Sequence, residues 1–473
     1  MSREIATLSD GTTIRYIPEV IGEGAEKLVY FTDDRSSVVC LYKKPGDDAT
    51  MRRRRLEKIL GEFNPTIGDR SASYWKELFC WPIGIVEKPS LGILCRAYPK
   101  NYFFSSGPLK GKEKQGLWYF GKKASRQLDP SEKGTWGDFF AGCIVLARAV
   151  GRLHKAGLAH SDLSYKNILI DPVPRGQAIV IDIDTLVVPR LFPPKVLGTK
   201  GYIAPEVMET MHLPIDDPNR KLPRIHTDRH ALPTLIYQYL LCRHPLEGPK
   251  VHSKDPDEDE LLSQGKGALF IENPSDKSNR PNDVKVPFTI LGKQLSDLFL
   301  QAFVAGLHNP DKRPNATTWE GALLKTWDMI IPCPNANCTH KSFVLSDPGN
   351  VRCPFCGAKP KGMIPVLNLR KESRPGQWQP DGELVIHPKA GLRIWHVYDN
   401  VQPGPDVDRT RQAYFAFHNG NWIMINEKLQ NLISAAGNPV PPGKAVVLTD
   451  GAQIRLAQEE HGRTVEVNVI KLS

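Results

Sequence analysis

The sequence predicts an α+β chain with two lobes, one rich in strands and a larger one rich in helices, followed by a small cysteine module and an all-β tail. Alternating apolar residues recur in short runs through residues 12–100, with one charged helix near 49–62. Residues 136–157 repeat apolar side chains at three- and four-residue spacings and end at Gly157, as an amphipathic helix does. Four of the nine cysteines gather between residues 333 and 356, and 473 residues suffice for about three domains.

The composition is that of a folded chain without a membrane segment. Hydrophobic residues make up 40% and charged residues 24%, which is ordinary for a globular protein. No apolar run reaches the roughly 18 residues of a membrane-spanning helix, and the polar N-terminus lacks a signal-peptide core. We therefore expect a cytoplasmic protein with no membrane partner. The net charge of +10 permits nucleic-acid or phosphate binding without establishing either, and we do not expect a nucleic-acid partner.

Residues 160–171, HSDLSYKNILID, contain the most informative spacing in the chain. Asp162 and Asn167 lie five residues apart, after the predicted helix and before an apolar strand. This pattern resembles the catalytic loop of protein kinases. The resemblance implies that Asp162 orients the attacking hydroxyl and accepts its proton. It also implies that the side-chain oxygen of Asn167 holds Mg²⁺ near the phosphates of ATP.

Further motifs follow in the order in which protein kinases have them. They are Asp182 after an apolar strand, residues 198–206 (GTKGYIAPE), Asp228 at the start of an apolar helix, and Arg313 within DKRP. Asp182 stands where the family has its metal-binding Asp-Phe-Gly, which implies a second Mg²⁺ ligand, and Arg313 is expected to pair with Glu206. The resemblance covers residues 12–328 and implies a two-lobed protein kinase fold, with an N-lobe over 12–100 and a C-lobe over 101–328.

The phosphate-binding lysine of the N-lobe has two candidate positions. In the segment IGEGAEKLVY, Gly22 and Gly24 resemble the first glycines of the family's phosphate-binding loop, where a missing side chain lets backbone N–H groups approach phosphate. Lys27 replaces the third glycine, and the next strand offers Cys40 and Lys43. Either Lys43 is the strand lysine, or Cys40 occupies that position and Lys27 supplies the charge, an arrangement similar to the With-No-Lysine kinases.

Two details favour Lys27 over Lys43. A tight turn before the strand would place Cys40 in its middle and Lys43 at its frayed end. Glu57 lies 17 residues beyond Cys40 (57 − 40), within the spacing at which the family places the helix glutamate that pairs with the lysine. We therefore expect Glu57 to be the lysine's partner. The four arginines at 52–55 of the same helix are expected to form a solvated face or a substrate-docking surface.

Several residues depart from the kinase pattern. Ser161 stands where many regulated kinases have an arginine that pairs with a phosphorylated activation loop, so we expect activity that does not depend on such phosphorylation. Lys166 offers the charge that Ser/Thr kinases place two residues after the catalytic aspartate, and Thr199 favours Ser/Thr over Tyr as the acceptor. Asp184 replaces a glycine and would restrict backbone flipping or touch a second metal.

The clustered cysteines are spaced like the ligands of a four-Cys zinc ribbon, expected over residues 330–360. The ligands would be Cys333, Cys338, Cys353 and Cys356. The CPFCG turn supports this interpretation, because its glycine can adopt a left-handed conformation that lets backbone N–H groups reach sulfur. A structural Zn²⁺ is therefore expected, with redox use of the thiols as the alternative and His340 as a competing ligand.

The rest of the chain is expected to be a basic Pro/Gly linker near 357–382 and a small β-sandwich over 383–473. The end of the tail resembles the closing strands of forkhead-associated domains, although their phosphothreonine-binding elements are not found. The combination resembles bacterial Ser/Thr kinases that occur beside von Willebrand factor A proteins of the tellurite-resistance type and metal-dependent phosphatases. This resemblance implies an ATP- and Mg²⁺-dependent kinase that acts on a partner protein; the alternative is a nucleotide-binding pseudokinase scaffold.

Overall fold

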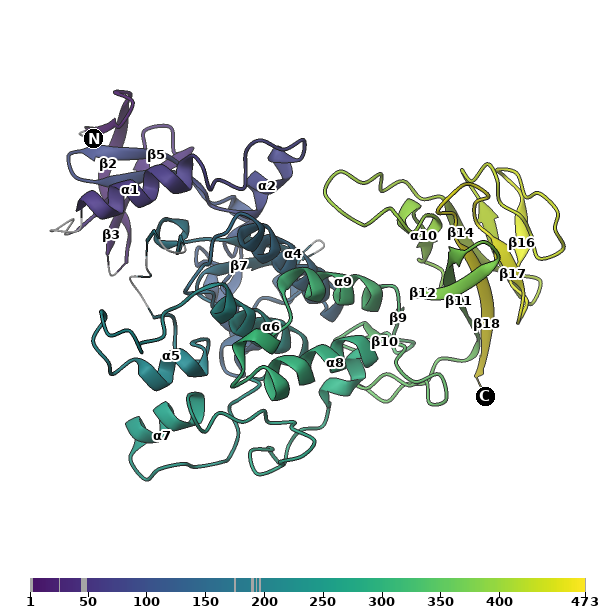
Figure 1. Cartoon of the computed structure of the whole chain (residues 1–473). Helices are drawn as coiled ribbons and strands as arrows, with labels where there is room; N and C mark the ends of the chain where they lie inside the picture. The colour runs from purple at the N-terminus through teal and green to yellow at the C-terminus, as the bar shows by residue number, and fades with distance from the viewer. Residues whose placement is uncertain are drawn as a thin grey trace. The chain divides into compact units, whose positions relative to one another are not determined.

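The computed structural model describes residues 3–24, 26–43, 49–173, 176–188, 191–192, 194 and 197–472. The chain divides into two compact units, each described here by itself (Figure 1). The first unit contains Met1–Gly134, Asp138–Lys285 and Asp297–Glu320, and the second contains Thr135–Gly137, Val286–Ser296 and Gly321–Ser473. No helix among the described residues is long and apolar enough to cross a membrane.

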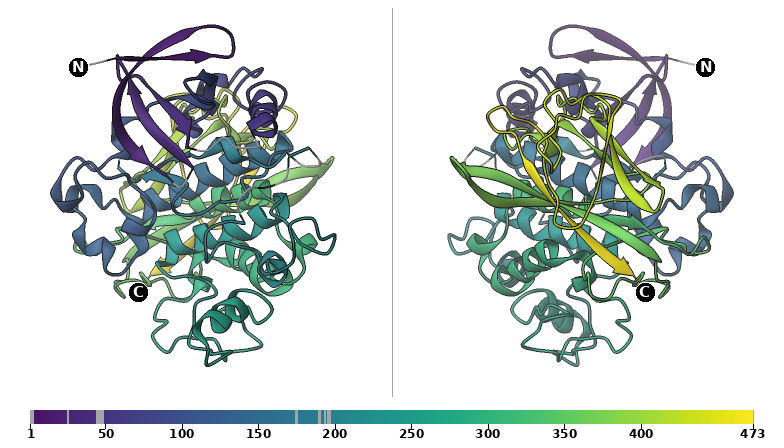
Figure 2. Two further views of the ribbon diagram at one scale, coloured as in Figure 1. Left: turned by 90° about the vertical axis from the view of Figure 1, so that its left-hand side faces the viewer. Right: turned by 90° about the vertical axis from the view of Figure 1, so that its right-hand side faces the viewer.

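The N-terminal part of the first unit, whose first strands are purple in Figure 2, is an antiparallel barrel. The described strands close it in the order β1-β2-β3-β4-β6-β5. These strands are β1 (Glu4–Leu8), β2 (Thr13–Glu23), β3 (Lys27–Thr32), β4 (Ser37–Tyr42), β5 (Pro82–Lys88) and β6 (Gly92–Arg96). Alternate side chains point inward, and Ala6, Tyr16, Val39 and Val86 are buried in the centre. The lobe therefore begins before residue 12, because Ala6 and Leu8 of β1 already contribute to its core.

Helices make up most of the rest of the first unit. Up to residue 327 the described α-helices are α1 (Ala49–Leu60), α2 (Ala72–Leu78), α3 (Leu117–Phe120), α4 (Trp136–Lys155), α5 (Pro205–Thr210), α6 (Ile225–Leu241), α7 (Pro256–Gln264), α8 (Lys293–Leu300) and α9 (Ala316–Trp327). Parts of α4, α8 and α9 belong to the second unit. Helix α4 confirms the helix predicted from the apolar spacing at 136–157. Most side chains of α6 are buried, so it is a central helix of this part of the unit.

A short β-hairpin brings together the segments that form the candidate site. Strand β7 (Ile168–Asp171) pairs antiparallel with β8 (Gln177–Val180), with Ile168 opposite Val180. Because paired antiparallel strands begin and end side by side, the loop before β7 and the residues after β8 lie next to each other. This topology brings Asp162 and Asn167 to Asp182.

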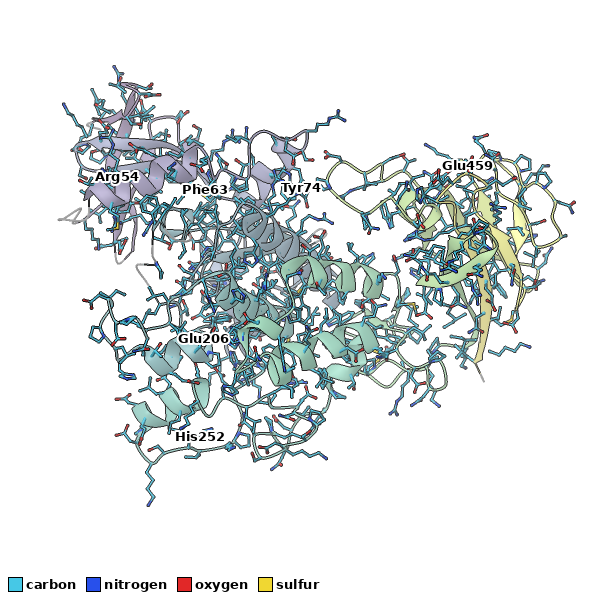
Figure 3. The ribbon with its side chains drawn as sticks, viewed as in Figure 1. Arg54, Phe63, Tyr74, Glu206, His252 and Glu459 are labelled. Carbon is cyan, nitrogen blue, oxygen red and sulfur yellow. The ribbon has the colours of Figure 1, made fainter. Side chains whose placement is uncertain are left out.

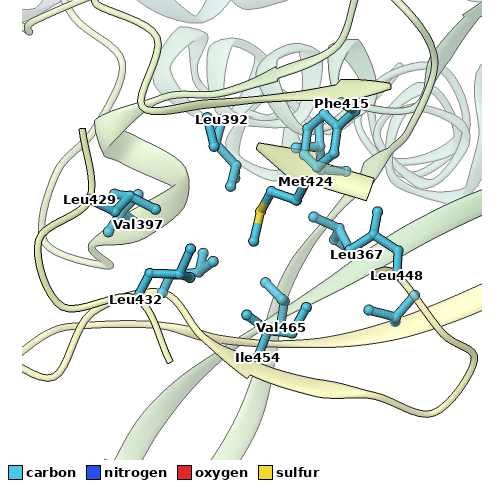
Figure 4. Packing of buried hydrophobic residues seen from close by; sticks show 14 of the residues in the cluster. Leu367, Leu392, Val397, Phe415, Met424, Leu429, Leu432, Leu448, Ile454 and Val465 are labelled. Carbon is cyan, nitrogen blue, oxygen red and sulfur yellow. The ribbon is translucent and has the colours of Figure 1, made fainter. Parts of the chain in front are cut away.

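The second unit contains two four-stranded antiparallel sheets that share one hydrophobic core. Their orders are β12-β11-β18-β17 and β13-β14-β15-β16. The core includes Leu367 and Val465 of the first sheet and Phe415 and Met424 of the second (Figure 4). The strands and the one helix of this region are β11 (Gly362–Arg374), β12 (Gln377–Val385), β13 (Gly391–Leu392), α10 (Ile394–Val397), β14 (Ala413–His418), β15 (Asn421–Asn426), β16 (Ala445–Val447), β17 (Gln453–Arg455) and β18 (Thr464–Leu472).

Residues 357–382 were expected to be a linker, and most of them instead form a β-hairpin. Strands β11 and β12 pair with each other, and β11 also pairs along its length with β18. The inward side chains of β11, including Leu367 and Leu369, are buried in the shared core. The segment reads as polar because the outer half of the hairpin is exposed, so composition concealed the buried part. The all-β region therefore begins at Gly362, earlier than residue 383.

Candidate active site

The catalytic-loop residues Asp162 and Asn167 are joined directly by hydrogen bonds. The Asn167 Nδ2 donates to the backbone oxygen of Asp162 at 2.8 Å and to its Oδ2 at 3.0 Å. The other carboxylate oxygen, Oδ1, accepts a 2.8 Å bond from the Thr199 hydroxyl. The structure thus brings together the two predicted loop residues and the threonine of the GTKGY segment. Because Asn167 uses its amide nitrogen within the loop, its amide oxygen is the atom with metal-binding chemistry.

Asp228 braces the loop through hydrogen bonds from the loop's backbone. Its Oδ2 accepts from the backbone N–H of His160 at 2.7 Å, and its Oδ1 from that of Ser161 at 3.2 Å. Ser161 has a left-handed backbone with φ of 67°, which costs an L-residue about 1–2 kcal/mol. The Asp228 carboxylate holds this strained residue in place directly before Asp162. The His160 ring contacts the carbonyl oxygen of Ile181 at 2.9 Å, so His160 supports the loop.

Asp182 follows β8 and lies beside the catalytic loop. The backbone N–H of Ile181 donates to the carbonyl of Asn167 at 3.0 Å, which brings the two predicted metal ligands next to each other. Asp182 also has a left-handed backbone, with φ of 60°, and precedes the short 3₁₀ helix η5 (Ile183–Thr185). An amide oxygen and a carboxylate are ligands that suit Mg²⁺, so the residues present fit that ion.

Lys27 reaches this site from the barrel. Its ammonium lies 2.7 Å from Asp182 Oδ1 and 2.6 Å from Asp184 Oδ1. Burial alone would lower the pKa of Lys27, but the two carboxylates raise that pKa well above its ordinary value. Burial would likewise raise the pKa of the Asp184 carboxyl, and the Lys27 ammonium holds it below its usual value. Lys27 is therefore a charged ammonium in a carboxylate-lined site.

The register of β3 and β4 separates the two candidate lysines. Lys27 lies directly opposite Tyr42, and Val29 lies opposite Cys40, so these four side chains share one face of the sheet. Lys43 comes one residue after Tyr42, and its Nζ pairs with Glu23. The structure brings Lys27 to Asp182 and does not bring Lys43 there.

Glu57 does not reach either lysine, contrary to expectation. It is exposed and pairs with Arg53 of its own helix at 3.3 Å. The buried face of α1 is formed by residues spaced three and four apart, among them Leu56 and Ile59. Each helix residue is rotated by about 100° from its neighbour, so Glu57 points away from the face that Leu56 buries. Spacing along the chain gave the correct helix but not the orientation of this residue.

The arginine run of α1 also differs from expectation. Arg52 and Arg55 are buried, with exposed fractions of 7% and 1%, while Arg53 and Arg54 are exposed (Figure 3). The guanidinium of Arg52 lies 4.0 Å from the centroid of the Tyr42 ring. The run is therefore not one solvated face: Arg52 packs against Tyr42 of the barrel, and Arg55 lies over the Phe192 ring, 5.8 Å from its centroid.

The remaining predicted site residues are Gly22, Gly24 and Lys166. The backbone N–H of Gly24 donates to the carbonyl of Lys27 at 3.0 Å. A Cβ at Gly24 would meet nothing within 4 Å, and one at Gly22 only the Val29 side chain at 3.6 Å, so neither glycine is required by packing. The next loop residue, Ala25, lies outside the described residues. Lys166 is exposed, with Nζ 5.9 Å from its neighbour Tyr165's ring centroid, and makes no ion pair with a described residue.

The predicted pair between Arg313 and Glu206 is confirmed. The guanidinium donates to both carboxylate oxygens, at 2.8 and 2.7 Å, and the Arg313 side chain is fully buried. Glu206 lies in α5 (Figure 3), directly after the GTKGYIA segment. Arg313 also donates to the backbone carbonyls of His226 and Leu307. This bidentate pair ties the segment that ends at α5 to the loop that precedes α9.

The four predicted thiol ligands of the second unit also converge. The sulfurs of Cys333, Cys338, Cys353 and Cys356 all lie within 4.8 Å of one another. The Cys333–Cys356 and Cys338–Cys353 sulfur pairs are 3.5 and 3.9 Å apart, far from the roughly 2.05 Å of a disulfide. Four sulfurs at about 2.3 Å from a tetrahedral Zn²⁺ would be about 3.8 Å apart, so the cluster fits that ion.

The surroundings of the thiol cluster support the same interpretation. Gly357 has the expected left-handed backbone, with φ of 76°. A backbone hydrogen bond from Ala358 lowers the pKa of the Cys356 thiol to about 7, which favours the metal-binding thiolate. His340, the competing ligand, instead stacks on the Phe355 ring at 3.8 Å. The flanking strands are β9 (Ile330–Pro332) and β10 (Ser342–Val344), which pair antiparallel.

The strand barrel, the central helices, the braced loop and the Arg313–Glu206 pair of the first unit agree with the protein kinase fold that the sequence resemblance implies. No protein-family profile matches the chain, and no curated protein matches it. Among solved structures it is similar to a Toxoplasma gondii specific rhoptry antigen kinase domain, at 15% identity and a TM-score of 0.38, covering 58% of this chain and 84% of that one. It is also similar to ROP2 from Toxoplasma gondii, described as a virulence factor with a protein-kinase fold and no enzymatic activity, at 14% identity and a TM-score of 0.44, covering 69% of this chain and 84% of that one.

Proposed function

We propose that the chain is a protein kinase that transfers the γ-phosphoryl group of ATP to a Ser or Thr hydroxyl of a partner protein. The observation that supports this most is the meeting of four groups at one place: the Asp162 carboxylate, the Asn167 amide, the Asp182 carboxylate and the Lys27 ammonium. These groups come from the barrel, the loop before β7 and the residues after β8. A purely structural cluster would not need all four chemistries together.

Each group has a role that its position supports. Asp162 would accept a hydrogen bond from the acceptor hydroxyl through an oxygen that now accepts from Thr199, 2.8 Å away. Lys27 would bind the phosphates of ATP. Asn167 and Asp182 would hold Mg²⁺, which neutralises phosphate charge when bound. The chain's contribution to the rate would come from positioning and from fixed charges.

The acceptor and partner follow from the resemblance and from Thr199. The hydroxyl bond from Thr199 to Asp162 supports the Ser/Thr acceptor class that the GTKGY segment suggests. We also propose that the substrate is a partner protein, with a von Willebrand factor A protein and a metal-dependent phosphatase as the candidates to test. Purified candidates can be added to the transfer assay one at a time.

Transfer can be tested with labelled ATP and Mg²⁺, comparing the wild type with Asp162→Ala. We expect label on Ser or Thr of the protein itself or of an added acceptor, identified by phosphoamino-acid analysis. Loss of a general base typically costs about 10²–10⁴-fold in rate, so the variant should be nearly silent. Equal labelling by the two proteins would contradict the kinase proposal.

A pseudokinase scaffold is the second candidate function. The observation in its favour is that Lys27 pairs with Asp182, a predicted metal ligand, and that Glu57 does not draw the lysine away. A wild type that binds a fluorescent ATP analogue but labels no acceptor, with Mg²⁺ or Mn²⁺ present, would favour this candidate.

Activity is expected not to depend on phosphorylation of the activation segment. Ser161 occupies the position of the arginine that would read such a phosphate, and it is buried, with its backbone N–H on Asp228. Phosphatase treatment, followed by removal of the phosphatase, should leave the initial transfer rate within about twofold. Complete loss of activity after this treatment would contradict the expectation.

A further inference from the structure

The Lys27 ammonium has a buried carboxylate partner on the segment that follows the predicted metal ligand. We propose that Asp184, rather than a glutamate of α1, is the positioning residue that holds Lys27 for the phosphates of ATP. This inference rests on the proposed nucleotide-binding role of the site, and it assigns to Asp184 a function that replaces the expected role of Glu57.

The geometry around Asp184 is that of a fixed anion. Its Oδ1 lies 2.6 Å from Lys27 Nζ, and its Oδ2 accepts a 2.5 Å hydrogen bond from the Tyr42 hydroxyl. Lys27 and Tyr42 are directly opposite each other on β3 and β4, so one cross-strand pair supplies donors to both carboxylate oxygens. A carboxylate held through both oxygens has a single orientation, and it fixes the lysine in turn.

The two carboxylates beside Lys27 differ in exposure. The Asp184 side chain is 1% exposed, whereas that of Asp182 is 37% exposed. The more exposed carboxylate can take a metal ion from solvent, and the buried one has both oxygens engaged by the protein. If Asp182 held Mg²⁺, Lys27 would retain Asp184, so metal binding would not leave the lysine without a counter-charge.

Helix α1 offers no acidic alternative on its inward face. The buried positions of α1 are Arg52, Arg55, Leu56 and Ile59. The inward Arg52 stacks on the Tyr42 ring and pairs with Glu26 at 2.8 Å. An ammonium that is only 18% exposed is costly without a partner, so the lysine's anion has to come from another element.

This arrangement determines which segment of the chain sets the position of Lys27. Asp184 lies in η5, two residues after Asp182. Lys27 is thereby tied to the metal-binding segment and not to α1. A rearrangement after β8 would remove Asp182 and Asp184 from Lys27 together.

A double-mutant cycle on nucleotide affinity tests whether Asp184 acts through Lys27. The dissociation constant of a fluorescent ATP analogue is measured for the wild type, Asp184→Asn, Lys27→Met and the double variant. We expect Asp184→Asn to weaken binding by about tenfold in the wild type and by less than about twofold in the Lys27→Met background, because coupled residues are not additive. The rival variant Glu57→Gln should change affinity by less than about twofold in either background.

The outcomes separate this inference from the proposed kinase activity. Equal effects of Asp184→Asn in both backgrounds, or an effect of Glu57→Gln as large as that of Asp184→Asn, would overturn it. A wild type that binds nucleotide without transferring phosphate contradicts the kinase proposal. The double-mutant cycle on nucleotide affinity still tests the role of Asp184 in that case. A wild type that binds no nucleotide overturns both.

A second variant covers the case in which Asp184→Asn does not fold, as judged by circular dichroism and thermal unfolding. Tyr42→Phe removes one donor to Asp184 and keeps the ring beneath Arg52. It should weaken nucleotide binding by about threefold, and this loss should disappear in the Lys27→Met background. An unchanged affinity for Tyr42→Phe, or a loss that persists without Lys27, would contradict the proposed positioning role.

Discussion

Two residues with left-handed backbones lie on either side of the candidate catalytic chemistry. Ser161 immediately precedes Asp162, and Asp182 is itself the predicted metal ligand. Non-glycine residues adopt this conformation at a cost that surrounding contacts must offset, and such residues cluster at functional sites. Here Asp228 offsets it at Ser161 through two backbone hydrogen bonds, and Lys27 contacts the Asp182 carboxylate. Side chains from separate elements therefore stabilise the backbone conformations that position the carboxylates of Asp162 and Asp182.

Substituting each of the two candidate lysines tests directly which one binds the phosphates of ATP. Lys27→Met should weaken ATP binding by about tenfold or more, because it removes the ammonium that faces Asp182 and Asp184. Lys43→Met should change binding by less than about twofold, because its ammonium pairs with Glu23 on the other face of the sheet. Titration of both variants with a fluorescent ATP analogue checks this, and full binding by Lys27→Met would assign the phosphate to another group.

At the scale of elements, the helices and the hairpin hold the functional segments by a few buried polar contacts. Asp228 belongs to α6, the most buried helix of the first unit, and it reaches the backbone of the catalytic loop. Arg313 precedes α9 and clamps Glu206 of α5. The loop and the segment after it are irregular chain, so their shape depends on these carboxylate contacts more than on their own backbone pairing.

The Arg313–Glu206 pair should be one of the strongest polar contributions to stability in the first unit. Glu206→Gln leaves the fully buried guanidinium without its counter-charge, and breaking a buried pair in this way costs about 3–5 kcal/mol. Urea unfolding or thermal melting followed by circular dichroism measures the loss. Glu57→Gln is the matched control: it breaks an exposed pair with Arg53 and should cost less than about 1 kcal/mol. Equal losses would show that burial of the Arg313 pair does not matter.

At the scale of the whole molecule, the second unit has two separate sources of stability. One is the apolar core between its two sheets, and the other is the thiol cluster with its own apolar residues. Cys338 and Cys353 are themselves members of that second, smaller core. The small size of this region makes a bound ion a large fraction of its stabilisation.

Metal content tests the thiol cluster. The purified protein should carry about one equivalent of zinc, and Cys353→Ser should lose it, because a structural site needs all four ligands. Cys242→Ser is the control, since Cys242 is an exposed cysteine of the first unit and should leave the zinc content unchanged. Elemental analysis gives the stoichiometry, and melting curves with and without a chelator give the stabilisation. Full zinc content in Cys353→Ser would contradict a four-thiolate site.

The sequence alone determined the features that depend on residues close together in the chain. The spacing of Asp162 and Asn167 predicted the loop in which they meet, the apolar repeat predicted α4, and the paired cysteines predicted the thiol cluster. Each of these features depends on residues that are close together in the sequence, because a turn, a helix face or a pair of ligands involves only neighbouring residues.

Tertiary structure alone decided which distant groups meet. Lys27 and Lys43 lie 16 residues apart (43 − 27), and only the register of β3 and β4 shows which of them faces Asp182. The outward direction of Glu57 depends on which face of α1 is buried, and the pairing of β11 with β18 joins residues about 100 positions apart. The contacts of Asp184 are the clearest case. A carboxylate beside the predicted metal ligand has no local signal for a lysine partner, and only its burial against Lys27 and Tyr42 reveals that partner.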